Sequence, residues 1–65
     1  MNILLNGEAY ATDAKTLDEL CARLGFAEAK IATTVNGNFV AATARPAVEL
    51  APSDEIEILA PRQGG

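Results

Sequence analysis

The amino-acid sequence predicts a small α+β domain, in which a mixed sheet of four to five strands packs on one main helix. Three observations support this fold class. Two Asn-Gly dipeptides lie between β-prone segments, and such dipeptides are typical of two-residue hairpin turns because both positions accept positive φ. Between the two hairpins, one segment has apolar residues at helical spacing. Near the C-terminus, another β-prone segment alternates polar and apolar residues.

The first predicted element is a hairpin over residues 1–12. Residues 1–5 are apolar and favour a strand, and residues 8–12 are predicted to form the returning strand. Asn6-Gly7 between them is suited to a type I′ turn. A short polar connector then leads to the helix.

The helix is predicted over residues 17–24. Thr16 and Glu19 have the spacing of a capping box, in which Thr16 accepts from the Glu19 amide while Glu19 reaches back to the Thr16 amide. Gly25 suits the left-handed position that follows a last helical turn. The apolar residues of this segment recur at i, i+3, i+4 and i+7, so they share one helix face that packs on the sheet. They are Leu17, Leu20, Cys21 and Leu24.

The second hairpin follows a short link. Residues 31–35 are predicted as a strand, Asn36-Gly37 as the turn and Phe39-Val40 as the start of the next strand. Residues 41–49 have no clear period. Arg45-Pro46 disfavours a long helix there, because proline restricts the residue before it to extended geometry.

The last strand is predicted over residues 55–59, after a short extended piece at residues 48–50 and a turn marked by Pro52 and Asp54. The globular domain therefore comprises residues 1–60, and residues 61–65 are expected to form a flexible tail.

The alternation in the last strand predicts that Glu55 and Glu57 face solvent. If these carboxylates dock on a basic partner surface, charge reversal slows association at low salt. For Phe39 and Leu59 we favour burial in the core over the alternative, an exposed apolar docking patch.

The composition limits the function classes. A chain of 65 residues buries only about 60% of the surface that it exposes when unfolded, so an enclosed active site has little room and we expect no enzyme. The net charge of −4 argues against nucleic acid, whose phosphates bind clustered Lys and Arg. No apolar stretch reaches the roughly 20 residues that span a bilayer. Because Met1 leads directly into a strand, we expect a cytoplasmic protein without a signal peptide, monomeric when alone.

Cys21 is the only cysteine, and the chain has no histidine. An intramolecular disulfide is therefore impossible, and a cluster of thiols and imidazoles for a metal ion or for nucleophilic catalysis cannot form. Because Cys21 lies on the apolar helix face, we interpret it as a small buried side chain rather than a reactive thiol.

The chain ends in Gly64-Gly65, and the second glycine carries the free α-carboxylate. At an average glycine usage of roughly 7%, such an ending arises by chance in about 0.5% of chains, so it requires an explanation. Residues without Cβ can enter a narrow channel and bring a carboxyl carbon close to another protein's catalytic groups. The alternative interpretation is a frayed end without a function.

Four segments together carry a family resemblance. Residues 55–65 resemble the C-terminal end of the ThiS family, the sulfur carriers of thiamine biosynthesis, and residues 34–40 are similar to its Val-Asn-Gly hairpin. The opening residues 1–7 and the helix of residues 16–24 also match the layout of that family. The resemblance covers the whole chain and implies the ubiquitin-like β-grasp fold, with the last strand inserted beside the first and parallel to it.

Two segments depart from the family pattern. Pro52-Ser53-Asp54 stands where the family usually has a Gly-Asp turn, and residues 41–48 are rich in alanine where the family often has polar and aromatic residues. Both lie outside the tail, so they concern the choice of partner more than the chemistry.

The resemblance also implies a mechanism. A ubiquitin-activating-type adenylyltransferase uses ATP and Mg²⁺ to adenylate the Gly65 carboxylate. A persulfide sulfur donor then replaces AMP, which leaves a covalent thiocarboxylate at Gly65, and thiazole synthase takes up the sulfur. The carrier is a co-substrate of these enzymes and itself holds no cofactor.

The other tail residues provide access to the partner sites. Gly64 gives steric clearance, and Arg62 and Gln63 either remain solvated or form hydrogen bonds with the walls of the partner channel. Four or five extended residues span roughly 15 Å, which allows the carboxylate to reach an enclosed site.

Three alternatives use the same terminal carboxylate: the small subunit of molybdopterin synthase, which is usually longer, a tRNA-thiolation carrier and a ubiquitin-like protein modifier. A fourth belongs to another class, a β-grasp interaction module without tail chemistry.

Overall fold

The computed structural model describes residues 1–26 and 30–60. Within this part, the chain forms five strands, an α-helix and a 3₁₀ helix. In chain order the elements are β1 (Asn2–Leu5), β2 (Glu8–Ala11), α1 (Leu17–Arg23), β3 (Ala32–Val35), β4 (Asn38–Val40), the 3₁₀ helix η1 (Ala42–Ala47) and β5 (Glu55–Leu59). The predicted strands and helix are all present, and their ends differ from prediction by one residue at most.

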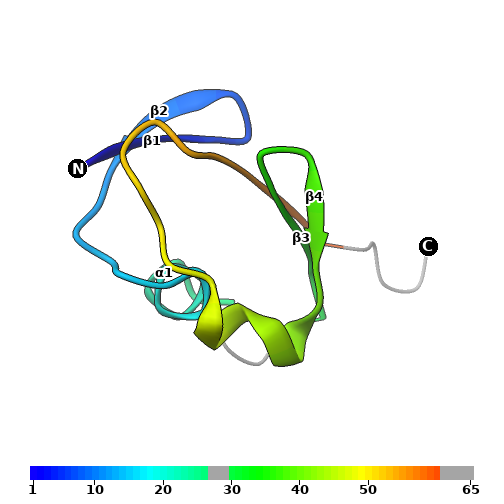
Figure 1. Ribbon diagram of the computed structural model, residues 1–65. Helices are drawn as coiled ribbons and strands as arrows, with labels where there is room; N and C mark the ends of the chain where they lie inside the picture. Colours follow the sequence, from blue (N-terminus) through cyan, green and yellow to red (C-terminus); the bar gives the residue numbers. More distant parts are fainter. Residues whose placement is uncertain (27–29, 61–65) are drawn as a thin grey trace.

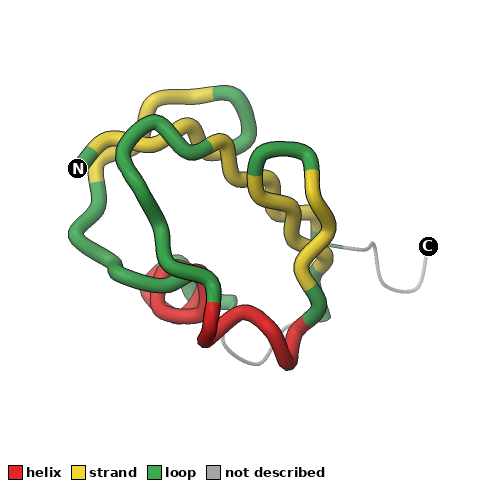
Figure 2. Tube along the Cα trace, in the orientation of Figure 1, coloured by secondary structure: helices red, strands yellow, loops and turns green. Residues whose placement is uncertain are grey.

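The strands form one sheet in the order β2-β1-β5-β3-β4, with β5 in the centre (Figure 1). β5 runs parallel to β1 and antiparallel to β3, whereas both hairpins are antiparallel. α1 and η1 lie on the same side of this sheet (Figure 2). A mixed sheet that packs on one main helix in this order is the β-grasp arrangement, so the predicted fold class is confirmed.

The asparagines of both Asn-Gly turns also form side-chain hydrogen bonds with distant residues. Asn6 and Asn36 both have φ of 51°, and each is followed by a glycine at positive φ. The Asn6 side chain accepts from the Ile58 amide at 2.9 Å and donates to the Ile58 carbonyl at 3.3 Å. The Asn36 side chain accepts from the Glu55 amide at 2.9 Å and donates to Asp54 at 3.1 Å. Both hairpin turns are thus fastened to β5 or to the turn before it.

The start of α1 is capped largely as predicted. The Thr16 hydroxyl accepts from the Glu19 amide at 3.1 Å, and Gly25 after the helix has a φ of +88°. The second bond of the predicted capping box differs, because the Glu19 carboxylate accepts from the Lys15 amide, at 2.6 Å, instead of the Thr16 amide. The Glu19 side chain therefore reaches the amide of Lys15, one residue before the N-cap residue Thr16.

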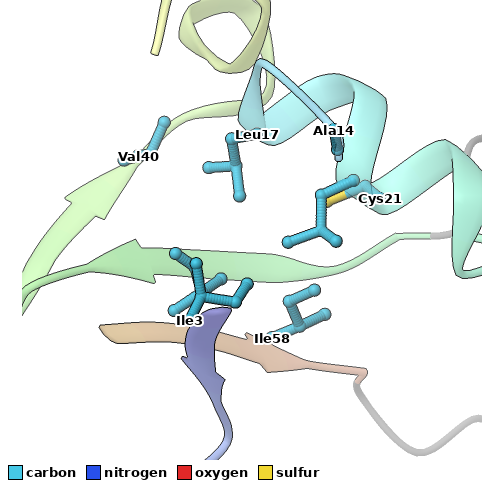
Figure 3. Close-up of a cluster of buried hydrophobic side chains, with 8 residues drawn as sticks. Ile3, Ala14, Leu17, Cys21, Val40 and Ile58 are labelled. Carbon is cyan, nitrogen blue, oxygen red and sulfur yellow. The ribbon is translucent and has the colours of Figure 1, made fainter. Parts of the chain in front are cut away.

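The core lies between α1 and the facing side of the sheet. Its buried apolar residues are Ile3, Ala14, Leu17, Leu20, Cys21, Val40, Ile56 and Ile58. In Figure 3, the side chains of Ile3 and Ile58 point from the sheet toward α1. The prediction that Cys21 is a buried member of the apolar helix face is confirmed.

The predicted irregular segment after β4 is a short 3₁₀ helix that contains Pro46. Its most informative residue is Arg45, a buried cation that the sequence analysis did not identify. The Arg45 guanidinium donates to the Thr33 hydroxyl at 3.1 Å and to the Ile31 carbonyl at 2.8 Å. Thr33 in turn donates to the Val40 carbonyl at 2.8 Å. This network ties η1 to the inner face of β3.

The predicted extended piece at residues 48–50 makes a bridge rather than a strand. Glu49 lies opposite Thr16, the Leu17 amide donates to the Val48 carbonyl, and the Leu50 amide donates to the Lys15 carbonyl, both at 2.9 Å. The segment therefore holds the start of α1 and leads the chain back to β5.

Candidate functional site

The central position of β5 determines where the C-terminal residues leave the sheet. Leu59, the last residue of β5, pairs with Ala32 at the beginning of β3. The predicted site residues Arg62, Gln63, Gly64 and Gly65 follow directly in the sequence and lie outside the described residues. Their roles stay predictions, and the structure defines the strand that precedes them in the sequence.

The residues of β5 alternate between the two faces of the sheet. Ile56 and Ile58 are buried against α1, whereas Glu55, Glu57 and Leu59 are exposed on the outer face. The prediction that both glutamates face solvent is confirmed. Within the described residues, no helix covers this outer face.

The prediction of core burial for Phe39 and Leu59 was wrong. Their side chains are 70% and 68% exposed, respectively. The reason is strand parity: Phe39 precedes Val40, which occupies the inward position of β4, and Leu59 follows inward-facing Ile58. Large apolar residues at outward positions remain in solvent whatever their hydrophobicity.

The registers show which outer residues are neighbours. Thr34 of β3 lies between Phe39 and Glu57, and its hydroxyl donates to the Glu57 carboxylate at 2.8 Å. Leu4 of β1 lies opposite Glu55 and is 37% exposed. We name these outward residues the outer sheet patch. It consists of Leu4, Phe39, Leu59, Glu55 and Glu57, three apolar side chains and two carboxylates.

A groove of about 190 Å³ opens between the two Asn-Gly turns. We name it the turn groove. It is lined by Leu4, Gly7, Gly37, Glu55, Ile56 and Glu57. It therefore shares Leu4 and both glutamates with the outer sheet patch, and it runs along the strand that leads to the C-terminus.

A larger hollow of about 570 Å³ lies at the other end of the sheet, where β1 begins. It is lined by Met1, Asp13, Ala14, Lys15, Thr16, Glu49 and Leu50. Its charged groups are of mixed sign, and these residues contain no thiol or imidazole for nucleophilic chemistry. Its place at the start of β1 separates it from Leu59 at the end of β5.

Comparison with known proteins identifies the family. A model described as the ThiS family matches residues 3–65. The chain belongs to the ThiS family. A search of curated proteins gives no match. Among solved structures, this ThiS-family chain is similar to the crystal structure of the thiamine biosynthesis protein ThiS from Geobacter metallireducens. The two chains are 30% identical, the alignment covers all of both, and the TM-score is 0.79.

The resemblance that the sequence indicated is therefore confirmed at the level of family and fold. The match extends over the turn at Pro52-Ser53-Asp54 and over the alanine-rich residues 41–48, so these departures do not remove the chain from the family. The alanine-rich stretch forms η1, in which Arg45 provides the buried polar contact.

Within this ThiS-family domain, the one thiol is shielded. Burial raises the pKa of the Cys21 thiol, although the nearby Arg45 guanidinium opposes this effect. A thiol that stays protonated is a weak nucleophile, so the geometry gives Cys21 a packing role. In the described residues, no group of three or more His, Cys, Asp or Glu is placed to hold a metal ion. No helix in the described part of the chain is long and apolar enough to cross a membrane.

Proposed function

We propose that this chain is a sulfur carrier of thiamine biosynthesis, which acts as a protein co-substrate and not as a catalyst. The observation that carries the proposal is the ThiS-family match, which runs to Gly65, the second residue of the terminal Gly64-Gly65 pair. The similar solved structure, of a thiamine biosynthesis protein, supports the same pathway.

The proposed chemistry takes place at the Gly65 carboxylate. A carboxylate oxygen attacks the α-phosphorus of Mg²⁺-bound ATP, pyrophosphate leaves, and an acyl-adenylate forms. The terminal sulfur of a persulfide then attacks the acyl carbon and displaces AMP. A second thiol cleaves the resulting acyl disulfide and becomes oxidised to a disulfide, which leaves a thiocarboxylate on Gly65. Adenylation is needed because attack on a free carboxylate must overcome its negative charge and expel oxide.

The domain supports this chemistry by presenting the C-terminal segment on a firmly held strand. β5 is bonded on both sides, and the Asn6 side chain adds two hydrogen bonds at Ile58, next to the last residue of the strand. Gly64 and Gly65 carry no Cβ, so they fit a partner channel that excludes larger residues. The proposed partners are an adenylyltransferase of the ubiquitin-activating type, a persulfide donor and thiazole synthase.

The test is intact-protein mass spectrometry after incubation with ATP, Mg²⁺, the cognate activating enzyme and the persulfide donor. The expected result is first the adenylate and then a mass gain equal to the replacement of one oxygen by sulfur. An unchanged mass overturns the proposal.

Variants locate the reacting group. Deletion of Gly65, or addition of one residue after it, is expected to abolish loading while thermal unfolding stays the same. Gly64→Val is expected to block activation on steric grounds. Cys21→Ser is expected to load normally because that thiol is buried. Loss of loading in Cys21→Ser, with the fold intact, would show that the tail is not the sole sulfur site.

Gene deletion separates the pathways. Thiamine auxotrophy is the expected phenotype, whereas a requirement for molybdopterin would assign the chain to the small subunit of molybdopterin synthase. Both outcomes keep the tail chemistry, so this experiment complements the mass measurement.

A further inference from the structure

The turn groove has the size of a site for one side chain. Its volume of about 190 Å³ is below the roughly 300–1,000 Å³ of pockets that bind small-molecule ligands. Two of its lining residues, Gly7 and Gly37, have no side chains, and a Cβ added to either would meet no atom within 4 Å. The two turns therefore leave an open space between them, with β5 at its base.

The charge of the groove is negative. Glu55 and Glu57 are two residues apart on β5, so their side chains extend from the same face of the sheet. Ion pairs among the described residues join Arg23 to Asp13 and to Glu19, and neither groove glutamate takes part in one. One Glu57 oxygen accepts from Thr34. A carboxylate offers about four acceptor positions on two oxygens, so both side chains keep capacity for a further donor.

The remaining contacts of the groove are apolar. Leu4 forms part of the lining, and the side chain of Leu4 is partly exposed on the outer face. Elsewhere on the outer face, the side chains of Phe39 and Leu59 are also exposed, at 70% and 68%. An apolar stem that ends in a cation matches this combination, and lysine and arginine side chains are built in this way.

We propose that the turn groove receives one arginine or lysine side chain of the adenylating partner. The methylene stem of that side chain packs against Leu4, and its cationic end donates to Glu55 and Glu57. The choice of partner rests on the proposed function. The adenylating enzyme meets the free carrier first, and at that encounter the net charge of −4 attracts a basic surface over long range.

The groove adds a specific contact to this general attraction, and the two effects differ in kinetics. Long-range attraction changes mainly the association rate, whereas loss of a desolvated charge pair changes mainly the dissociation rate. Glu57→Gln keeps the shape of the side chain and an oxygen for Thr34 but removes the charge. We expect the double variant Glu55→Gln/Glu57→Gln to weaken binding to the activating enzyme about tenfold or more, chiefly through faster dissociation.

Asp18→Asn is the matched control. Asp18 is exposed on α1, on the other side of the sheet, and its neutralisation changes the net charge by one unit, half the change in the double variant. The measurement is surface plasmon resonance of the full chain against the activating enzyme, at two or more salt concentrations. Asp18→Asn is expected to alter the association rate by less than about threefold and to leave the dissociation rate unchanged.

A third variant tests the space rather than the charge. Gly37→Asn places a neutral side chain at the mouth of the groove, and Asn tolerates the positive φ at this position better than most other non-glycine residues do. We expect faster dissociation, with the fold monitored by circular dichroism. If this variant does not fold, the glutamine variants still decide the question, because they alter exposed side chains only.

The outcomes separate this proposal from the proposed function. If the wild-type chain is adenylated but the glutamine variants dissociate at the wild-type rate, the groove proposal is overturned and the carrier function stands. If each glutamine substitution acts only on the association rate, as Asp18→Asn does, the carboxylates contribute general charge and the proposal again fails. If the wild-type chain neither binds the activating enzyme nor becomes adenylated, both proposals fail together.

Discussion

The two faces of the sheet carry similar apolar residues, which are buried on one face and exposed on the other. On the inner face, Ile56 and Ile58 are 1% and 6% exposed, whereas on the outer face Leu59 of the same strand is 68% exposed. The inner residues pack on α1, and the outer ones meet solvent beside two carboxylates. Hydrophobicity alone therefore does not decide burial in so small a domain. Strand parity buries the apolar residues of one face and leaves those of the other face exposed.

The largest expected effect comes from shortening an inner side chain. Ile56→Ala is expected to lower the free energy of unfolding by about 2–5 kcal/mol, because it removes buried methyl groups and leaves a cavity. Small domains have total stabilities of only about 5–15 kcal/mol, so this loss is a large fraction of the total. Urea unfolding followed by circular dichroism measures the change.

Leu59→Ala is the matched control on the outer face. We expect a change within about 0.5 kcal/mol, because the side chain is already in solvent. Equal destabilisation by the two substitutions would contradict the assignment of the two faces. A loss of partner binding in Leu59→Ala, without a loss of stability, would strengthen it.

Adjacent threonines of β3 allow the same comparison for polar groups. Thr33 is fully buried, donates to the Val40 carbonyl and accepts from Arg45. Thr33→Val leaves the Val40 carbonyl and the Arg45 guanidinium without their hydrogen-bond partner. We expect the free energy of unfolding to fall by about 1–3 kcal/mol. Thr34→Val on the outer face removes only the exposed bond to Glu57, and we expect less than about 0.5 kcal/mol. Thermal unfolding of the two variants side by side measures the difference.

Several features that depend on local pattern could be predicted from the sequence. The Asn-Gly turns, the apolar face of α1 and the alternation in β5 each follow from the order of neighbouring residues, and each is confirmed. Strand order is not local, and the central place of β5 was inferred from the family resemblance. The misassigned Phe39 shows the limit of local reasoning: one aromatic residue in a short strand does not reveal its parity, which is fixed by the neighbour that packs inside.

Features assembled from distant segments could not be predicted. The buried Arg45 gains acceptors from Thr33 of β3 and from Ile31, just before that strand, only because η1 folds back onto this segment. The turn groove combines glycines from both hairpin turns with glutamates of β5. No pattern within one segment indicates either of them. The functional tail, in contrast, is predicted from two residues at the chain end, Gly64 and Gly65.

Substitutions in the two hairpin turns are expected to have a smaller effect on stability. Asn6→Gly retains the positive φ of the turn but removes both hydrogen bonds with Ile58. We expect a loss of about 1 kcal/mol, because this site is partly shielded from water. Asn36→Gly removes bonds to Glu55 and Asp54 that are exposed, and we expect about half as much. Hydrogen exchange is expected to become faster at the Ile58 amide in Asn6→Gly and at the Glu55 amide in Asn36→Gly. Equally faster exchange of both amides in either variant would contradict the view that each turn holds its own end of β5.

The smallest effect is expected at the exposed ion pair of Asp13 and Arg23. The hydrogen bond from Arg23 and its positive charge lower the pKa of the Asp13 carboxyl from its usual 3.8. A carboxylate with a lowered folded-state pKa stabilises the fold above the unfolded-state pKa, and this contribution disappears as pH falls through the folded-state value. Asp13→Asn is therefore expected to lower stability slightly at pH 7 and not at all in strong acid. The difference is expected to shrink in 1 M salt, because both side chains are in solvent. Urea unfolding of both proteins at pH 7 and in acid measures it, and a difference that persists in acid would show that Asp13 acts through something other than its charge.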